Sequence, residues 1–110
     1  MANHGFGIMP VTPGKERYDT YDPEKYGCIF LGDDDLSPLL PEFEHIPCYW
    51  HTRLRPEYNL DYCGITLIPP SSASLFAEVW RRQDGRQFEP VLALFERGIR
   101  EEKFIIHYGL

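Results

Sequence analysis

The sequence predicts a small α+β protein, with a mainly antiparallel or mixed sheet of about four strands and two helices packed on one face. Four short apolar runs are typical of strands: residues 26–31, 48–54, 61–68 and 103–110. Two longer segments show the apolar spacing of helices: residues 71–83 and 90–102. Strands and helices do not alternate regularly, so a doubly wound α/β fold is disfavoured. A chain of this size buries about two thirds of its unfolded surface in one core. We therefore expect a single domain over residues 1–110.

Residues 1–25 are expected to form an extended N-terminal arm. The segment holds three prolines and three glycines, few aliphatic side chains, and no helical or strand periodicity. Such an arm needs anchors, either on the second face of the sheet or on another subunit. The side chains that fit this role are Phe6, Ile8, Met9, Tyr18 and Tyr21.

The middle of the chain begins with a buried strand, YGCIFL at residues 26–31, which is bounded by turn signals. An acidic turn, Asp33–Asp35, follows it. The position after a strand is one where enzymes often hold Mg²⁺, but a solvated turn with one aspartate capping a short helix is the commoner arrangement. Residues 38–45 are expected to form one or two helical turns, whose length Pro41 limits.

Two further strands are expected to pair as a hairpin over residues 48–68. In each strand the apolar side chains share one parity, which is typical of a strand with one buried face: Cys48, Trp50 and Leu54 in the first, and Cys63, Ile65 and Leu67 in the second. If residues 55–60 form the loop, Trp50 lies opposite Ile65 and the apolar side chains meet on one side of the sheet.

The second half of the chain contains the two helices. The first is expected over residues 71–83, with Ser71 or Ser72 as its N-terminal cap and an apolar stripe at helical spacing. The second begins with Pro90 at its first position and runs to about Glu102. The last strand then closes the fold.

The net charge of −6 is distributed unevenly. Residues 1–50 carry nine acidic and three basic side chains, whereas residues 51–110 carry eight of each. Nucleic-acid binding through phosphate neutralisation needs clustered Lys and Arg, so that class of function is disfavoured. Seven of the eight bases in the second half are Arg, whose planar fork suits carboxylate and phosphate groups, so a small anionic ligand remains an alternative partner.

The cysteines indicate a compartment. Cys28, Cys48 and Cys63 make an odd count in a chain with no apolar signal segment at its start, and free thiols in a cytoplasmic protein are the natural interpretation. The longest apolar runs are far shorter than the roughly 20 residues that a membrane-spanning helix needs. We therefore expect no membrane partner.

The second face of the expected hairpin is the leading candidate for chemistry. In the register above, Gly64 leaves a gap opposite His51, and the side chains on this face are Tyr49, His51, Arg53, Tyr62 and Thr66. A small enzyme or ligand-binding protein would use His51 as acid or base, Arg53 to hold an anionic group, and a tyrosine to orient the ligand. The alternative is a solvated face, or one that the N-terminal arm covers.

No metal or cofactor is expected. Four potential ligands lie within nineteen residues, but Cys48 and His51 project to opposite faces of a strand and there is no Cys-x-x-Cys. Buried structural thiols explain the cysteines better. GFG at residues 5–7 lacks the preceding strand and following helix that a phosphate loop requires.

The expected function is non-catalytic binding through the acidic, tyrosine-rich first half of the chain. YDTYDPEKY mixes acids with aromatics, and the expected interaction surface consists of Tyr18, Asp19, Tyr21 and Asp22. One form of this function is a bacterial-type inhibitor or immunity protein, which the negative first half would steer to a basic protein partner. A simpler form is a homo-oligomer, in which the same arm packs on a second copy.

Overall fold

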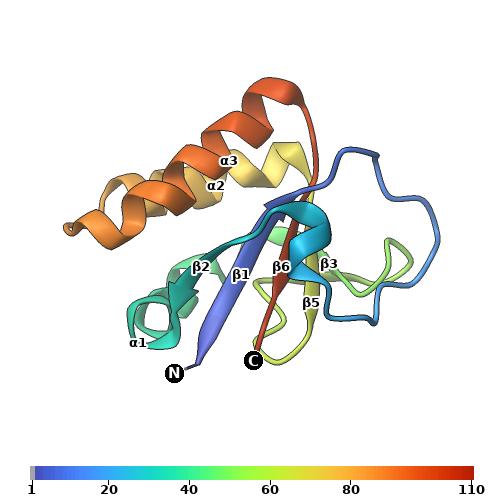
Figure 1. The fold of residues 1–110 in the computed structure, drawn as a ribbon, viewed down its shortest axis with the longest axis horizontal. Helices are drawn as coiled ribbons and strands as arrows, with labels where there is room; N and C mark the ends of the chain where they lie inside the picture. Colours follow the sequence, from blue (N-terminus) through green and yellow to red (C-terminus); the bar gives the residue numbers. More distant parts are fainter. Residues whose placement is uncertain (1) are drawn as a thin grey trace.

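The computed structural model describes residues 2–110 and shows an α+β fold built on a six-stranded antiparallel sheet (Figure 1). The strand order across the sheet is β2-β1-β6-β5-β3-β4. The strands are β1 Asn3–Ile8, β2 Ile29–Gly32, β3 Pro47–Trp50, β4 Pro56–Tyr58, β5 Ile65–Ile68 and β6 Ile105–Tyr108. The predicted α+β class is confirmed, and the expectation of about four strands is too low because β1 and β4 carried no recognisable strand pattern.

Three α-helices and three 3-10 helices complete the described part of the chain. They are α1 Asp33–Leu36, α2 Pro70–Arg81, α3 Glu89–Glu101, η1 Pro23–Tyr26, η2 Ser37–Phe43 and η3 Arg86–Phe88. The predicted serine caps of α2 are wrong: the helix starts at Pro70, because the fixed φ of proline suits a first helical position, and Ser72 instead donates to the carbonyl of Pro47. Among residues 2–110, no helix has the length and apolar character that crossing a membrane requires.

β1 lies inside the segment that was expected to be an extended arm. It pairs with β2 on one side and with β6 on the other. Its side chains do alternate, with His4, Phe6 and Ile8 directed to the helices, but glycine fills the positions between them. Since glycine usually signals a turn, the strand was hidden, and only the residues after Ile8 run as an arm.

β3 and β5 pair as predicted, but in a register one residue away from the expected one. Trp50 lies opposite Thr66, not opposite Ile65. A slip of one residue sends side chains to the other face, so Thr66 faces the helices while Tyr49 faces the opposite side. The physical reason is that both faces of the sheet are apolar, so matching one greasy face does not define the register; Cys48 packs on the helix side, whereas Ile65 and Leu67 pack on the other side. The left-handed φ of His51, 64°, then ends β3 after Trp50.

The expected hairpin loop contains β4. After β3 the chain turns back within residues 51–55, and β4 pairs with the outer edge of β3. Pro56 and Glu57 are typical of loops, so residue patterns do not indicate a strand here. β3 therefore lies between β4 and β5, and its first hairpin partner is β4.

Apolar side chains cover both faces of the sheet. On one face, α2 and α3 run side by side (Figure 1) and pack aromatic and aliphatic side chains against β1 and β6. The opposite face carries a smaller cluster: Met9, Ile65, Leu67, Phe104, Ile106 and Tyr108. Tyr18 and Tyr26 cover it, so Met9 and Tyr18 anchor the arm on this face, whereas Phe6 and Ile8 belong to the helix side.

Candidate functional site

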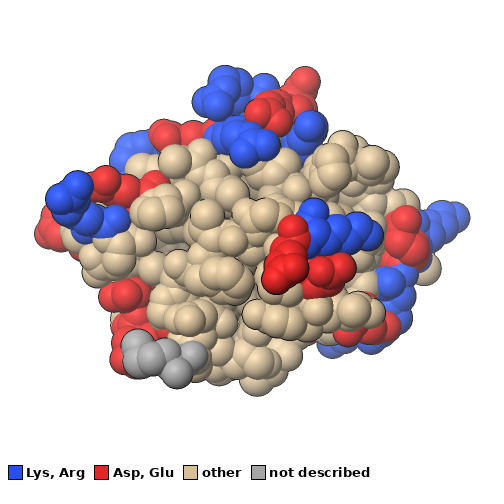
Figure 2. Space-filling model, viewed as in Figure 1, with Lys and Arg blue, Asp and Glu red and all other residues tan. Residues whose placement is uncertain are grey.

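A pocket of about 770 Å³ lies at the end of the sheet where β1 begins and β6 ends. Phe30 of β2, the loop before β5, and Asp19 and Tyr21 of the arm complete its walls. Figure 2 shows a broad area without charged side chains that extends over this lower end of the sheet. Asp19 is the one acidic side chain of the lining, and no Lys or Arg of the described chain belongs to it.

Exposed apolar side chains converge on this pocket. Tyr21 is 65% exposed, Phe30 50% and Leu110 44%, and all three contribute to the lining. Large apolar side chains that stay in water in one contiguous patch mark binding surfaces in soluble proteins. The pocket therefore combines an apolar wall with a single carboxylate.

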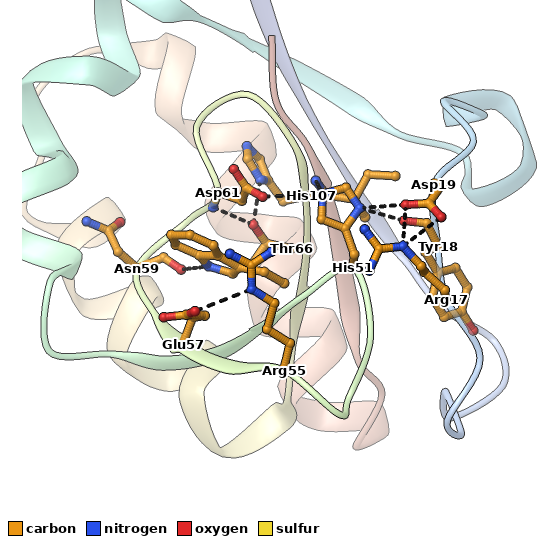
Figure 3. Close-up of polar contacts among 12 residues, drawn as sticks. Arg17, Tyr18, Asp19, His51, Arg55, Glu57, Asn59, Asp61, Thr66 and His107 are labelled. Atoms are coloured by element: carbon orange, nitrogen blue, oxygen red, sulfur yellow. Dashed lines mark hydrogen bonds and ion pairs between the residues drawn. The ribbon is translucent and has the colours of Figure 1, made fainter.

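His51 forms one wall of the pocket and fastens three segments together (Figure 3). Its backbone N–H donates to Ile65 O at 2.9 Å, and its carbonyl accepts from Tyr18 N–H at 2.7 Å. Its ring Nδ1 lies 2.8 Å from Tyr18 O and 3.2 Å from the Asp19 carboxylate, while Nε2 lies 3.3 Å from the Asp61 carboxylate. His51 thus holds the arm against β3 and the loop before β5.

Gly64 does not leave the gap that was expected opposite His51. A Cβ at Gly64 would collide with the Asp61 carboxylate and lie 2.6 Å from His51 Nε2. The space is therefore already filled by the contact between these two side chains. Gly64 is required because that contact passes directly over its backbone.

Arg53 and Tyr49 lie away from the pocket. Arg53 stacks over the rings of Tyr49 and Phe104, at 5.5 and 5.0 Å from their centroids, and donates to Pro13 O. These contacts place it beneath the arm on the second face of the sheet. The hypothesis that His51 and Arg53 share one polar face is wrong, because the left-handed turn at His51 separates them.

Tyr62 and Thr66 belong to a buried polar network on the helix side of the sheet. His4 Nδ1 lies 3.0 Å from His107 Nε2. On its other side, His107 Nδ1 lies 3.0 Å from Thr66 Oγ1 (Figure 3). His4 Nε2 reaches Asp33 Oδ1 at 2.9 Å, and the Tyr62 hydroxyl donates to the same carboxylate at 2.7 Å. Four neighbouring strands or their ends therefore contribute to one hydrogen-bonded row.

The protons of this network can be assigned from its ends. The Asp33 carboxylate accepts, so His4 donates through Nε2–H and accepts at Nδ1 from His107 Nε2–H. His107 Nδ1 then accepts from the Thr66 hydroxyl, whose oxygen accepts in turn from the backbone N–H of Asp61 at 2.8 Å. Each bond of the row then has a donor and an acceptor, with His107 neutral and a negative charge at Asp33.

The pKa shifts follow the same arrangement. Burial is the larger cause that lowers the pKa of His107 well below its usual 6.5, and the neighbouring His4 ring lowers it further. Hydrogen bonds from His4 and then Tyr62 lower the pKa of Asp33, and the bond to Asp33 raises the pKa of Tyr62. Since His4, His107 and Thr66 are fully buried and none of them lines the pocket, the network is built to hold strands in register.

Sequence reasoning missed His4 and His107. They lie 103 residues apart, so no local spacing links them. The available signal is their spacing: His4 lies two residues from Phe6, and His107 lies two residues from Ile105. In a strand, residues two apart share a face, so each histidine lies on a face with a buried apolar residue. A buried polar residue needs a partner, and a search for such pairs would have joined the two.

The predicted interaction surface is split by the structure. Asp19 and Tyr21 line the pocket, whereas Tyr18 packs on the second face of the sheet and Asp22 lies beside a separate small hollow. Burial raises the pKa of Tyr18. Asp19 also receives a 2.8 Å ion pair from Arg17, so part of its charge is already neutralised.

The thiols and metal-ligating side chains form no further site. Burial raises the pKa of Cys28 to about 11 and that of Cys48 to about 12, so both thiols stay protonated. Cys63 is exposed at the pocket. Across residues 2–110, no three side chains of His, Cys, Asp or Glu gather as metal ligands would.

Comparisons with family models, with curated proteins and with solved structures give no match to this chain. Its function is therefore argued from the pocket and from the charges around it.

Proposed function

We propose that the protein is a non-catalytic binding module, whose pocket holds an apolar segment with a basic side chain from another protein. The observation that carries this proposal is the convergence of Tyr21, Phe30 and Leu110 on one pocket. Aromatic side chains with a polar rim are typical of the centres of protein interfaces. Asp19 at the wall supplies the acidic group for a basic side chain.

The charge distribution supports a basic partner over a second copy. The chain carries a net charge of −6, and the whole excess lies in residues 1–50, which include Asp19 and the acidic turn Asp33–Asp35. Two copies meeting through this half would repel one another, whereas a basic partner would be steered toward it. An inhibitor or immunity-type protein is the form of function that fits this pattern.

The competing function is a small enzyme or small-ligand binder that uses His51 as acid or base. Its position on the pocket wall favours this alternative. Two observations favour binding of a protein segment instead: both ring nitrogens of His51 already contact fixed oxygen atoms, and Arg53 is stacked beneath the arm. A lining without Lys or Arg is a poor site for an anion.

We place the protein in the cytoplasm. Cys28, Cys48 and Cys63 are all free thiols, which supports a reducing compartment. Binding should therefore be measured under reducing conditions, with a neutral or basic ligand.

The test is a selection from a random-peptide display library, followed by affinity measurements on synthetic copies of the selected peptides. We expect peptides with an aromatic or aliphatic residue close to Lys or Arg. Replacing Phe30 or Tyr21 by Ser should weaken binding at least about tenfold, since truncating a central aromatic anchor costs about 2 kcal/mol or more. Leu75→Ser and Tyr58→Ser are matched controls, because these side chains are exposed and apolar but lie outside the pocket.

Two results would contradict the proposal. One is a selection that yields no sequence preference. The other is a peptide whose affinity falls as much with the control variants as with Phe30→Ser. A peptide rich in Asp or Glu that depends on His51 would instead support the small anionic ligand alternative.

A further inference from the structure

The edge strand β2 offers unpaired backbone groups directly beside the pocket. β2 ends the sheet and pairs only with β1. Its next residue, Asp33, donates its N–H to Ala2 O at 2.9 Å, and alternate peptide groups of a strand point to the same side. The N–H and C=O of Phe30 and the N–H of Gly32 therefore point away from β1, and residues 2–110 supply no partner for them.

This edge lacks two of the features that usually protect a sheet edge, a charged residue and a proline. The segment Tyr26–Gly32 contains no charged residue and no proline. The opposite edge, β4, is three residues long, begins with Pro56 and includes Glu57. One edge of the sheet is thus blocked against strand addition and the other is left open.

The open edge has defined ends. At the start of β2, Cys28 N–H already donates to Pro23 O at 3.0 Å, so η1 closes that end. At the other end the acidic turn begins, and its Asp34 is exposed. Phe30, which is 50% exposed, projects from the same strand into the pocket. Backbone groups, an apolar anchor and negative charge therefore form one continuous surface.

We propose that the partner segment adds to β2 as an antiparallel strand, with its basic residues at its N-terminal end. This inference rests on the proposed function and specifies how the ligand is held. In an antiparallel strand, one peptide residue exchanges two hydrogen bonds with Phe30, and the carbonyl two positions before it accepts from Gly32 N–H. Residues that precede this carbonyl lie beside Asp34, which offers Lys or Arg a second carboxylate in addition to Asp19.

A protein segment of this charge fits better than a second copy of the chain. Two β2 strands paired about a two-fold axis would join two molecules that each carry a net charge of −6. They would also supply no basic residue, since Tyr26–Gly32 contains none. Strand addition by the chain itself is therefore an outcome that the experiment must distinguish.

Gly32 provides a precise test because its φ of −63° is the angle that proline adopts. Gly32→Pro removes the outward N–H without straining the strand, and Leu31 before it is already extended. Gly32→Ala is the matched control: it keeps the N–H, and its Cβ would meet only atoms at 3.8 Å, which is ordinary contact. Binding of the tightest display-selected peptide should weaken about tenfold in Gly32→Pro and stay unchanged in Gly32→Ala.

The peptide gives a second, independent measurement on the unmodified protein. N-methylation at the residue that pairs with Phe30 should abolish binding, while N-methylation of either neighbour should not. Moving the basic residues from the N-terminal to the C-terminal end of the peptide should also weaken binding. This scan decides the question if Gly32→Pro fails to fold.

The outcomes separate this inference from the proposed function. If Phe30→Ser weakens binding but Gly32→Pro and N-methylation do not, strand addition is refuted and the pocket function stands. If none of these changes weakens binding, both are refuted. A light-scattering mass of twice the chain, reduced to one chain by Gly32→Pro, would show that a second copy occupies the edge and would overturn the inference.

Discussion

The buried histidine pair predicts a loss of stability at mildly acidic pH. The unfolded chain takes up a proton at His107 below about pH 6.5, whereas burial lowers the pKa of the folded side chain well below that value. Between the two pKa values the unfolded state holds more protons. The contribution of His107 is therefore fully present above pH 6.5 and is lost as the pH falls toward the folded pKa.

The magnitude follows from one proton. While the folded His107 stays neutral, the free energy of unfolding falls by about 1.4 kcal/mol for each pH unit well below 6.5. Integrated from pH 7.5 to pH 5.0, the loss is about 2 kcal/mol. For a chain of this size that corresponds to a fall in Tm of about 8 °C.

The assay is thermal or urea unfolding at a series of pH values, for the natural chain and for His107→Gln. A glutamine amide donates and accepts hydrogen bonds but takes up no proton in this range. Its curve should lack the slope that His107 contributes, whatever its stability at neutral pH. The difference between the two curves removes the titration of groups outside the network, and parallel curves between pH 7.5 and 5.0 would show that His107 is not held neutral in the folded chain.

Two further predictions concern the wall of the pocket and the thiols. Gly64→Ala should lower the free energy of unfolding by about 1–3 kcal/mol, because a methyl group would push Asp61 from His51; urea unfolding measures this, and a variant as stable as the natural chain would contradict the geometry. Under native conditions a thiol reagent at pH 8 should modify one cysteine per chain quickly. Mass spectrometry should show that modification is fast at Cys63 and slow at Cys28 and Cys48. Equal rates at all three would show that the buried thiols are accessible.

The sequence predicts those elements in which apolar residues recur at helical or strand spacing. The helices α2 and α3 and the strands β5 and β6 lie where apolar spacing places them. β1 escaped notice because alternating glycines conceal a strand, and β4 because Pro56 and Glu57 are typical of loops. The register of β3 with β5 was missed because both faces of the sheet are apolar, so the parity of the apolar residues does not decide which strand faces meet.

The candidate site was predicted only in part for a related reason. The residue patterns point to His51, Asp19 and Tyr21, which lie at the pocket, but they predict Phe30 as a buried strand residue. Its exposure results from the position of β2 at the edge of the sheet, and strand order is a global property that local patterns do not contain. The same limit applies to His4 and His107, which only the completed sheet brings together.

The loop before β5 connects the buried network to the pocket. The N–H of Asp61 donates to Thr66 inside the network, while its carboxylate contacts His51 on the pocket wall. Tyr62, next in the chain, donates to Asp33 at the end of β2. Hydrogen bonds thus hold the loop on both sides. Protonation of His107 at Nδ1 would remove the acceptor of the Thr66 hydroxyl, and Thr66 is the side chain that binds the N–H of Asp61. The polar row that sets the strand register is therefore also what keeps this wall of the pocket in place.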